Sequence, residues 1–176
     1  MSIISKRYTK IIFKNFNKII YHKNNLLIRP LKIEDIKENY IKNLQDKTIN
    51  KYLVSKKKKE LTQNHIKQYV SKNQISANDI LFGIFFKKKH IGNCRVHFVK
   101  NELFIGITIF DKLKQRKGFG SKTLKIVPNF AFKNLNVNYI QAKIHNQNQN
   151  SINAFIKAGF KIKYKKNKYC FVIKKK

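Results

Sequence analysis

A short glycine-containing turn connects a run typical of a β-strand to a run typical of a helix. The turn spans residues 115–120 and reads Gln-Arg-Lys-Gly-Phe-Gly. The strand-like run before it spans 103–110, and the helix-like run after it spans 121–135. Backbone N–H groups are free at a helix start, and the helix dipole is positive there. The whole chain has only six glycines, and two of them stand in this turn. The sequence therefore predicts a strand–loop–helix unit that holds phosphate.

A second segment, residues 148–160, combines an Asn-x-x-Ser start with a Gly-Phe end. Asn148 and Ser151 open a helix-like run, and the Gly-Phe pair closes it before the next strand-like run. Near the beginning of the chain, residues 27–31 read Leu-Ile-Arg-Pro-Leu and are soon followed by two acidic residues. In this order the three motifs resemble the GCN5-related N-acetyltransferase (GNAT) superfamily. They are most similar to its RimJ/RimL-like branch of ribosomal-protein-alanine and amino-sugar acetyltransferases.

The resemblance implies an α/β fold of the α+β kind. Its central sheet is expected to be mixed and mostly antiparallel, with six to seven strands flanked by about four helices. The similarity begins near residue 26 and runs almost to the C-terminus, so residues 19–176 are expected to form a single N-acetyltransferase domain. Residues 1–18 contain five basic residues among apolar ones and are interpreted as a basic N-terminal extension.

Apolar periodicity indicates where the elements lie. Strands are expected at residues 19–21, 26–28, 80–86, 91–99, 103–110, 139–144, 160–164 and 169–173. Helices are expected at 33–44, after a Thr62 cap, at 121–135 and at 151–158. In the second helix, Ile66, Tyr69 and Val70 are expected to point inward.

The resemblance also implies acetyl-CoA as the cofactor. Coenzyme A carries a pyrophosphate and a 3′-phosphate, so its site needs backbone donors and nearby cations. Glycine lets the backbone approach such a ligand without a Cβ in the way. In the family, the strand before the loop splays from its neighbour and pairs with the pantetheine arm. The expected cofactor-binding residues are Ile107, Thr108, Ile109, Gln115, Arg116, Lys117, Gly118, Phe119, Gly120, Ser121 and Asn148.

Ser151 is the candidate general acid. In this branch of the family, the matching serine is thought to protonate the departing thiolate of coenzyme A. Many relatives use a tyrosine four residues further on, but that position here is Phe155, which has no proton to give. The alternative role for Ser151 is that of a helix N-cap, for which serine is favoured.

The general base must take a proton from the attacking ammonium. The family often uses a carboxylate near the position of Phe104, and phenylalanine cannot do this. Glu102 lies two residues earlier on the same strand face and is the candidate base, acting through water. Its alternative role is that of a surface residue at the start of the strand. His97 and His145 are further candidates, with ordinary sheet or loop positions as their alternative.

The net charge of the chain is extreme, since 40 Lys and Arg residues against 8 Asp and Glu residues give +32. Two explanations stay open. Lysine has A/T-rich codons, as do the abundant Asn, Ile, Phe and Tyr, so genome composition can supply much of the charge. Alternatively, the chain is selected for an anionic partner. In both cases the positive field attracts phosphate-rich ligands and lowers the pKa of a bound ammonium, so that a weak base, or none, is expected to suffice.

Several sequence features bear on location and metal binding. No apolar run approaches the roughly 20 residues of a membrane-spanning helix. Basic residues interrupt any secretory signal within residues 1–18, although an amphipathic targeting peptide is an alternative there. Cys94 and Cys170 lack metal-ligand spacing and are expected to pack as small apolar groups. We therefore expect a cytoplasmic monomer or homodimer with no metal site and no membrane association.

Two functions of different classes follow from the sequence. The first is an acetyl-CoA-dependent N-acetyltransferase that acts by direct attack of a primary amine, carried by a nucleotide-linked amino sugar or by a protein N-terminus. The second is a catalytically weak protein of the same fold that uses its basic surface to bind RNA or the ribosome. The intact phosphate turn favours the enzyme, whereas the charge and the phenylalanine at position 104 favour the binding protein.

Overall fold

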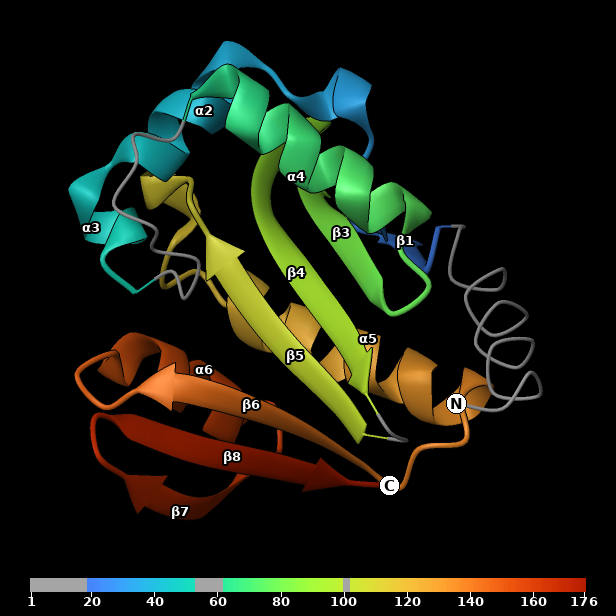
Figure 1. Ribbon diagram of the computed structural model, residues 1–176, viewed down its shortest axis with the longest axis vertical. Coiled ribbons are helices and arrows are strands. Elements are labelled where there is room, and N and C mark those ends of the chain that lie inside the picture. Colours follow the sequence, from blue (N-terminus) through green and yellow to red (C-terminus); the bar gives the residue numbers. More distant parts are fainter. Residues whose placement is uncertain (1–18, 53–61, 100–101) are drawn as a thin grey trace.

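Eight strands form a single mixed sheet in the order β1-β2-β3-β4-β5-β6-β8-β7 (Figure 1). The computed structural model describes residues 19–52, 62–99 and 102–176. Neighbouring strands pair antiparallel, except that β5 and β6 pair parallel. The strands are β1 Tyr21–Lys23, β2 Leu26–Pro30, β3 Asp79–Phe86, β4 Lys89–Val99, β5 Glu102–Ile109, β6 Tyr139–His145, β7 Lys161–Lys166 and β8 Tyr169–Lys175.

The mixed, mostly antiparallel α+β architecture is confirmed, but the sheet has more strands than the six to seven expected. The N-terminal hairpin joins the same sheet because β2 pairs with β3 along its whole length. Five α-helices and two 3-10 turns occur in the described residues: η1 Ile33–Asp35, α2 Glu38–Gln45, α3 Lys47–Asn50, α4 Gln63–Ile75, η2 Lys112–Lys114, α5 Phe119–Asn134 and α6 Gln149–Lys157. The proposed basic extension, residues 1–18, lies outside the described residues.

Helices cover both faces of the sheet, and each layer has its own core. In Figure 1, α2 and α4 lie in front of β3 and β4, while α5 and α6 lie behind the sheet. The larger core lies between the sheet and the rear helices and includes both cysteines, which are buried as expected. The smaller core, under α2 and α4, consists of Leu31, Ile36, Tyr40, Ile66, Val70, Leu81, Phe85 and Phe110. Across the described ranges, no helix is long and apolar enough to cross a membrane.

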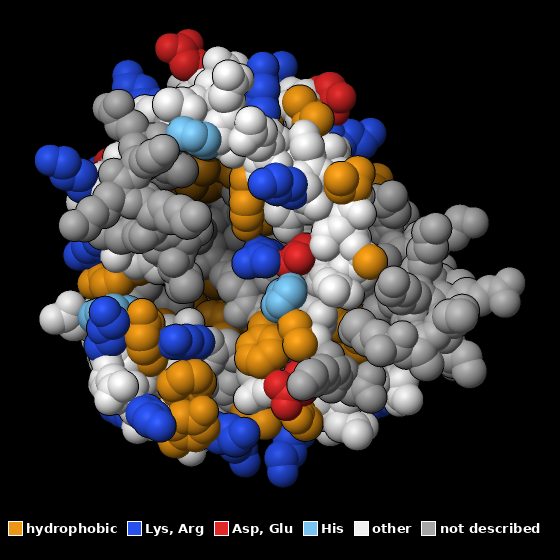
Figure 2. All heavy atoms as spheres, viewed as in Figure 1, with side chains coloured by type: hydrophobic (Ala, Val, Ile, Leu, Met, Phe, Trp, Pro, Cys, Tyr) orange, Lys and Arg blue, Asp and Glu red, His pale blue; other side chains and the backbone are white. Residues whose placement is uncertain are grey.

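The charge of the chain is carried on its surface. Figure 2 shows Lys and Arg side chains spread over one face of the molecule, with few Asp or Glu side chains among them. The outer strand β7 is exposed along its entire length.

The helix expected at 33–44 is broken in two. Arg29 donates two hydrogen bonds, of 2.6 and 2.7 Å, to the carboxylate of Asp35. The same carboxylate accepts the backbone N–H of Lys32, at 2.8 Å, and so caps a single 3-10 turn. Burial disfavours the charged carboxylate, but these hydrogen bonds outweigh it and hold the pKa of Asp35 below its ordinary value. Ile36 and Lys37 then take extended conformations, and α2 starts afresh at residue 38.

The helix after Thr62 forms as predicted, with one exception on its inner face. The Thr62 side chain accepts the backbone N–H of His65, as an N-cap does. Ile66 and Val70 are buried as expected, whereas Tyr69 is 39% exposed and so is buried only in part.

A buried polar network fixes α2 on β4. Asn93 donates from its side-chain nitrogen to the hydroxyl of Tyr40, at 2.6 Å, and its side-chain oxygen is 2.8 Å from Nε2 of His90. Burial raises the pKa of Tyr40 and lowers that of His90, so both side chains are neutral near pH 7.

The end of α6 confirms the Gly-Phe signal read from the sequence. Gly159 has a φ of +88°, which suits glycine. The N–H of Phe160 donates to the carbonyl of Phe155 at 3.1 Å, and the N–H of Gly159 donates to that of Ile156 at 2.9 Å. The two phenylalanine rings also pack edge to face, with centroids 4.9 Å apart. This pattern is a Schellman motif with its hydrophobic contact, and it fixes the direction of β7.

The two parallel strands separate soon after they meet. Their register contains two pairs, Leu103 with Ile140 and Phe104 with Gln141. Beyond these pairs, β5 continues to pair with β4 as far as Ile109, while β6 pairs with β8 along its whole length. The far half of β5 therefore has no strand partner on the β6 side.

Gly92 on β4 keeps β5 in place. A Cβ at this position would lie 2.6 Å from the carbonyl oxygen of Thr108 and 3.1 Å from Cα of Ile109, so the paired backbones would have to move. We expect Gly92→Ala to lower the free energy of unfolding by about 1–3 kcal/mol, as overpacking does. Chemical denaturation followed by circular dichroism measures this change. The matched control is Gly106→Ala on β5, where a Cβ meets nothing within 4 Å. Equal losses in the two variants would contradict the explanation.

Candidate active site

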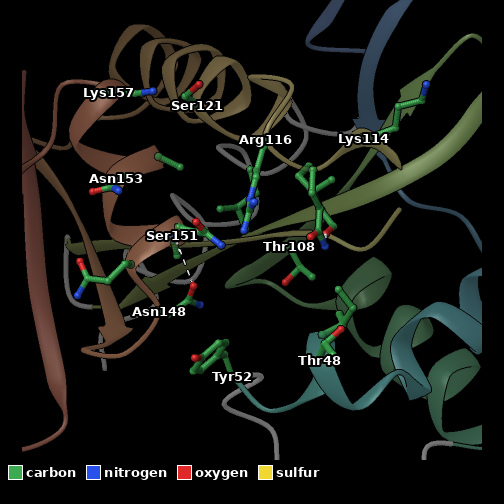
Figure 3. Close-up of a pocket in the computed structure, with 18 of the residues that line it drawn as sticks. Thr48, Tyr52, Thr108, Lys114, Arg116, Ser121, Asn148, Ser151, Asn153 and Lys157 are labelled. Atoms are coloured by element: carbon green, nitrogen blue, oxygen red, sulfur yellow. Dashed lines mark hydrogen bonds between the residues drawn. The ribbon is translucent and has the colours of Figure 1, made fainter. Parts of the chain in front are cut away.

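A cavity of about 610 Å³ opens where β5 and β6 separate. Its walls come from the end of β5, the start of α5, the loop between β6 and α6, one side of α6 as far as its last residue, and the α3 region (Figure 3). Segments far apart in the sequence thus meet around one space. The lining residues are Thr48, Ile49, Lys51, Tyr52, Ile107, Thr108, Ile109, Lys114, Gln115, Arg116, Gly118, Gly120, Ser121, Gln147, Asn148, Gln149, Asn150, Ser151, Asn153, Ala154 and Lys157.

The turn between β5 and α5 is shaped by two residues with positive φ, Arg116 at 58° and Gly118 at 83°. The Gln115 side chain donates to the carbonyl of Ile109, at 2.8 Å, and fastens the turn to the end of the strand. The first hydrogen bond of α5 runs from the N–H of Lys122 to the carbonyl of Gly118. The backbone N–H groups of residues 119–121 therefore have no partner within the helix. They lie beside the cavity, as a site for an anion requires.

The charge around the cavity is positive. Lys51, Lys114, Arg116 and Lys157 are among its lining residues, and the described part of the lining contains no Asp or Glu. The start of a sixteen-residue helix, α5, adds the positive end of its dipole. Together with the free backbone N–H groups, these cations fit a pyrophosphate or another phosphate-bearing group.

Asn148, and not Ser151, caps α6. The Asn148 side-chain oxygen accepts the N–H of Ser151 at 3.2 Å. This overturns the alternative that Ser151 is the cap. Within the described residues the Ser151 hydroxyl has no hydrogen-bond partner. In Figure 3, Ser151, Arg116, Thr108 and Tyr52 surround the same space from four sides.

Tyr52 and the α3 region close the cavity on the side opposite the phosphate turn. The hydroxyl of Tyr52 donates to the carbonyl of Gln147, at 3.3 Å, and its ring lies 5.7 Å from that of His145. Lys112 forms a 2.6 Å ion pair with Asp46, the N-cap of α3. The ion pair's hydrogen bond lowers the pKa of Asp46 below its ordinary value. Sequence reasoning missed this wall because its place depends on contacts between distant segments.

Most of the cofactor-binding residues expected from the sequence come together here. The structure places around the cavity Ile107, Thr108, Ile109, Gln115, Arg116, Gly118, Gly120, Ser121, Asn148 and also Ser151. Lys117 is exposed and lies outside the lining, so its side chain does not join them. Phe119 packs in the core, with its ring 4.8 Å from that of Phe86.

Glu102 lies at the far end of β5 and is not among the lining residues. Its carboxylate accepts hydrogen bonds from the hydroxyl of Tyr139, at 2.9 Å, and from the side chain of Gln141, at 3.2 Å. The bond to Glu102 raises the pKa of Tyr139. In this structure, Glu102 therefore links β5 to β6.

The two histidine candidates are also engaged elsewhere. Nδ1 of His97 lies 2.9 Å from the carboxylate of Asp79, outside the cavity. His145 packs between the rings of Tyr52 and Tyr169 and does not line the cavity. The described lining therefore supplies neither a carboxylate nor an imidazole.

The sequence profile of the acetyltransferase (GNAT) domain family matches residues 25–161, most of the chain. The chain belongs to the GNAT acetyltransferase family. Acetyl-CoA is the cosubstrate of this GNAT protein, and acetyl transfer to an amine is its class of reaction. A comparison with curated proteins gave no match.

Solved structures share the GNAT fold at low sequence identity. RimL, a ribosomal L7/L12 α-N-protein acetyltransferase in complex with coenzyme A, is 14% identical with a TM-score of 0.79, covering 90% of this chain and 98% of that one. An acetyltransferase from Salmonella typhimurium that modifies the N-terminal serine of L7/L12 is 16% identical with a TM-score of 0.73, covering 89% and 96%. The aminoglycoside acetyltransferase AAC(6′)-Ib with coenzyme A and kanamycin is 14% identical with a TM-score of 0.68, covering 85% and 94%.

A stability measurement can test whether Asn148 or Ser151 caps α6. Removing the cap in Asn148→Ala is expected to lower the free energy of unfolding by about 1 kcal/mol. Ser151→Ala removes a hydroxyl that has no hydrogen-bond partner among the described residues, and it is expected to change the free energy of unfolding by less than about 0.5 kcal/mol. Urea denaturation of both variants measures the difference. A larger loss in Ser151→Ala than in Asn148→Ala would return the capping role to Ser151.

Proposed function

We propose that the cavity binds acetyl-CoA with its pyrophosphate at the start of α5. The backbone N–H groups of residues 119–121 and the side chain of Arg116 hold the phosphates. The pantetheine arm lies along residues 107–109, where β5 has no partner on the β6 side. The observation that carries this proposal is that the unpaired strand and the free helix start face the same cavity.

Ser151 acts as the general acid in this proposal. Acetyl-CoA supplies an acetyl group that is activated as a thioester. When the amine displaces the thiolate, a donor is needed to protonate the departing sulfur. The Ser151 hydroxyl faces the cavity and has no protein partner among the described residues. Phe155 cannot replace it, since its side chain is 1% exposed and packs in the core.

The acceptor amine loses its proton without a carboxylate from the described residues of the cavity wall. Lys51, Lys114, Arg116 and Lys157 line the cavity and disfavour a bound ammonium, which lowers its pKa. An α-amine or a sugar amine starts closer to neutrality than a lysine side chain with its ordinary pKa of about 10.4. Such an amine binds in its neutral form, and Glu102, held by Tyr139 and Gln141, is not needed as the base.

The acceptor that fits this charge carries a primary amine next to an anionic group. A nucleotide-linked amino sugar meets both conditions, because its diphosphate is attracted by the same lysines that keep its amine neutral. A protein N-terminus is the second acceptor class, and structural neighbours of the chain modify such an N-terminus. A polycationic amine is disfavoured because the lining residues that the structure describes include four cations and no acidic residue.

Arg116 and Lys117 offer a matched pair for testing cofactor binding. Arg116 lines the cavity, whereas Lys117 is exposed and does not line it. Arg116→Gln is expected to raise the Kd of coenzyme A by about tenfold or more, because a charge-assisted hydrogen bond is lost. Lys117→Gln also removes one positive charge, but it is expected to change the Kd of coenzyme A by less than about threefold. Isothermal titration calorimetry measures both values. The proposal fails if coenzyme A produces no heat with the unmodified protein.

The role of Ser151 predicts a loss in turnover without a loss in cofactor binding. Ser151→Ala is expected to lower kcat by about 100-fold at saturating acetyl-CoA, since general acid catalysis contributes on that scale. The Kd of coenzyme A is expected to stay unchanged. A thiol-release assay with a panel of amines, including nucleotide-linked amino sugars, amino-terminal peptides and aminoglycosides, measures kcat. Ser121→Ala is the control, because this cavity hydroxyl already bonds to Gly118. An unchanged kcat in Ser151→Ala would remove Ser151 from the mechanism.

A further inference from the structure

The sheet face formed by β6, β8 and β7 has no helix over it among the described residues (Figure 1). The strand registers place two rows of side chains on this face. One row joins Tyr164, Phe171 and Lys143, and the other joins Lys166, Tyr169 and His145. Their strand neighbours Ala142, Ile144, Cys170 and Val172 point into the core on the opposite face, under α5 and α6. We call the six residues of the two rows the aromatic face.

The rings of the aromatic face are accessible and are held in place by the sheet. Tyr164 is 45% exposed, and its ring stacks on that of Phe171 with centroids 4.5 Å apart and planes 24° apart. Lys143 places its ammonium 4.0 Å from the ring centroid of Tyr169. Figure 2 shows hydrophobic side chains with lysines around them on the lower part of this side of the molecule, where these strands lie.

The strands that carry these rings are rich in lysine and have no acidic side chain, and the Glu102 carboxylate, on β5, is held by Tyr139 and Gln141 toward the other end of β6. Four of the six residues of β7 are lysine, and all six are exposed. Lys168, in the turn between β7 and β8, lies 5.8 Å above the ring of Tyr169. The sequence contains no Asp or Glu after Asp111, so none of these strands carries a side-chain carboxylate.

We propose that the aromatic face binds single-stranded nucleic acid. Bases stack on exposed aromatic rings whatever their sequence, and lysines beside the rings contact the phosphates between the bases. An acidic protein partner would match the positive charge, but it has no bases to stack on the aromatic rings that lie between the lysines. The face begins beside the cavity, since Tyr169 contacts His145, which contacts Tyr52 in the cavity wall. The proposal does not rest on acetyl transfer, because binding is measurable without acetyl-CoA.

Fluorescence anisotropy of a short labelled oligouridine with the full-length protein tests the proposal. Tyr164→Ala is expected to weaken binding about tenfold, the scale of one stacked base. Tyr164→Phe keeps the ring and is expected to keep the affinity. In a salt series, the double variant Lys143→Gln/Lys166→Gln is expected to reduce the slope of log K against log salt by about 1.4, since each phosphate contact on a single strand contributes about 0.7.

The matched control removes the same charge from the opposite face of the sheet. Lys125→Gln/Lys133→Gln changes two exposed lysines on α5 and is expected to leave the slope unchanged. Circular dichroism shows whether Tyr164→Ala unfolds the outer hairpin. If it does, the salt-dependence slopes of the two double lysine variants are compared instead, and they decide whether the aromatic face binds the oligonucleotide. Absence of binding, equal losses from both lysine pairs, or competition by polyphosphate as strong as that by unlabelled oligouridine would overturn the proposal.

Discussion

The separation of β5 from β6 is the constraint on which the rest of the structure depends. The two strands share two residue pairs, and then each follows its other neighbour: β5 stays with β4, and β6 stays with β8. A parallel pair that stayed in register would have closed the space in which the cavity lies. Because the strands part, the backbone of residues 105–109 is available on one side, and the start of α5 reaches the same opening.

Two polar contacts connect the α3 region to the other segments around the opening. The hydroxyl of Tyr52 reaches the carbonyl of Gln147 on the loop before α6, and Lys112 pairs with Asp46 at the start of α3. Both contacts are exposed and polar, so each contributes little to stability. They matter because of where they lie: they set the distance between the α3 region and the starts of α5 and α6, which face it.

The local parts of the site could be predicted from the sequence because their signals are short in range. The glycine at 118 has the positive φ that the turn needs, and the Gly-Phe pair ends α6 as expected. The cap of α6 lies in the expected segment, but Asn148 supplies it and not Ser151. What could not be predicted depends on tertiary contacts. The break after Asp35 follows from the hydrogen bonds that Arg29, on β2, donates to the Asp35 carboxylate. Tyr52 lines the cavity where its hydroxyl contacts Gln147, a residue far away in the sequence. Strand position alone could not show that Tyr139 and Gln141 hold the Glu102 carboxylate.

The composition of β7 also bears on how separate copies of the chain behave. This strand forms an outer edge of the sheet, and an unprotected edge offers unpaired backbone groups to any other extended chain. Four of its six residues are lysines. If the β7 edges of two molecules met, these lysines would lie opposite one another, and their like charges would repel. The register shift between Ile162 and Tyr164 also distorts the strand. The chain can thus expose a long edge strand while resisting aggregation into continuous intermolecular sheets.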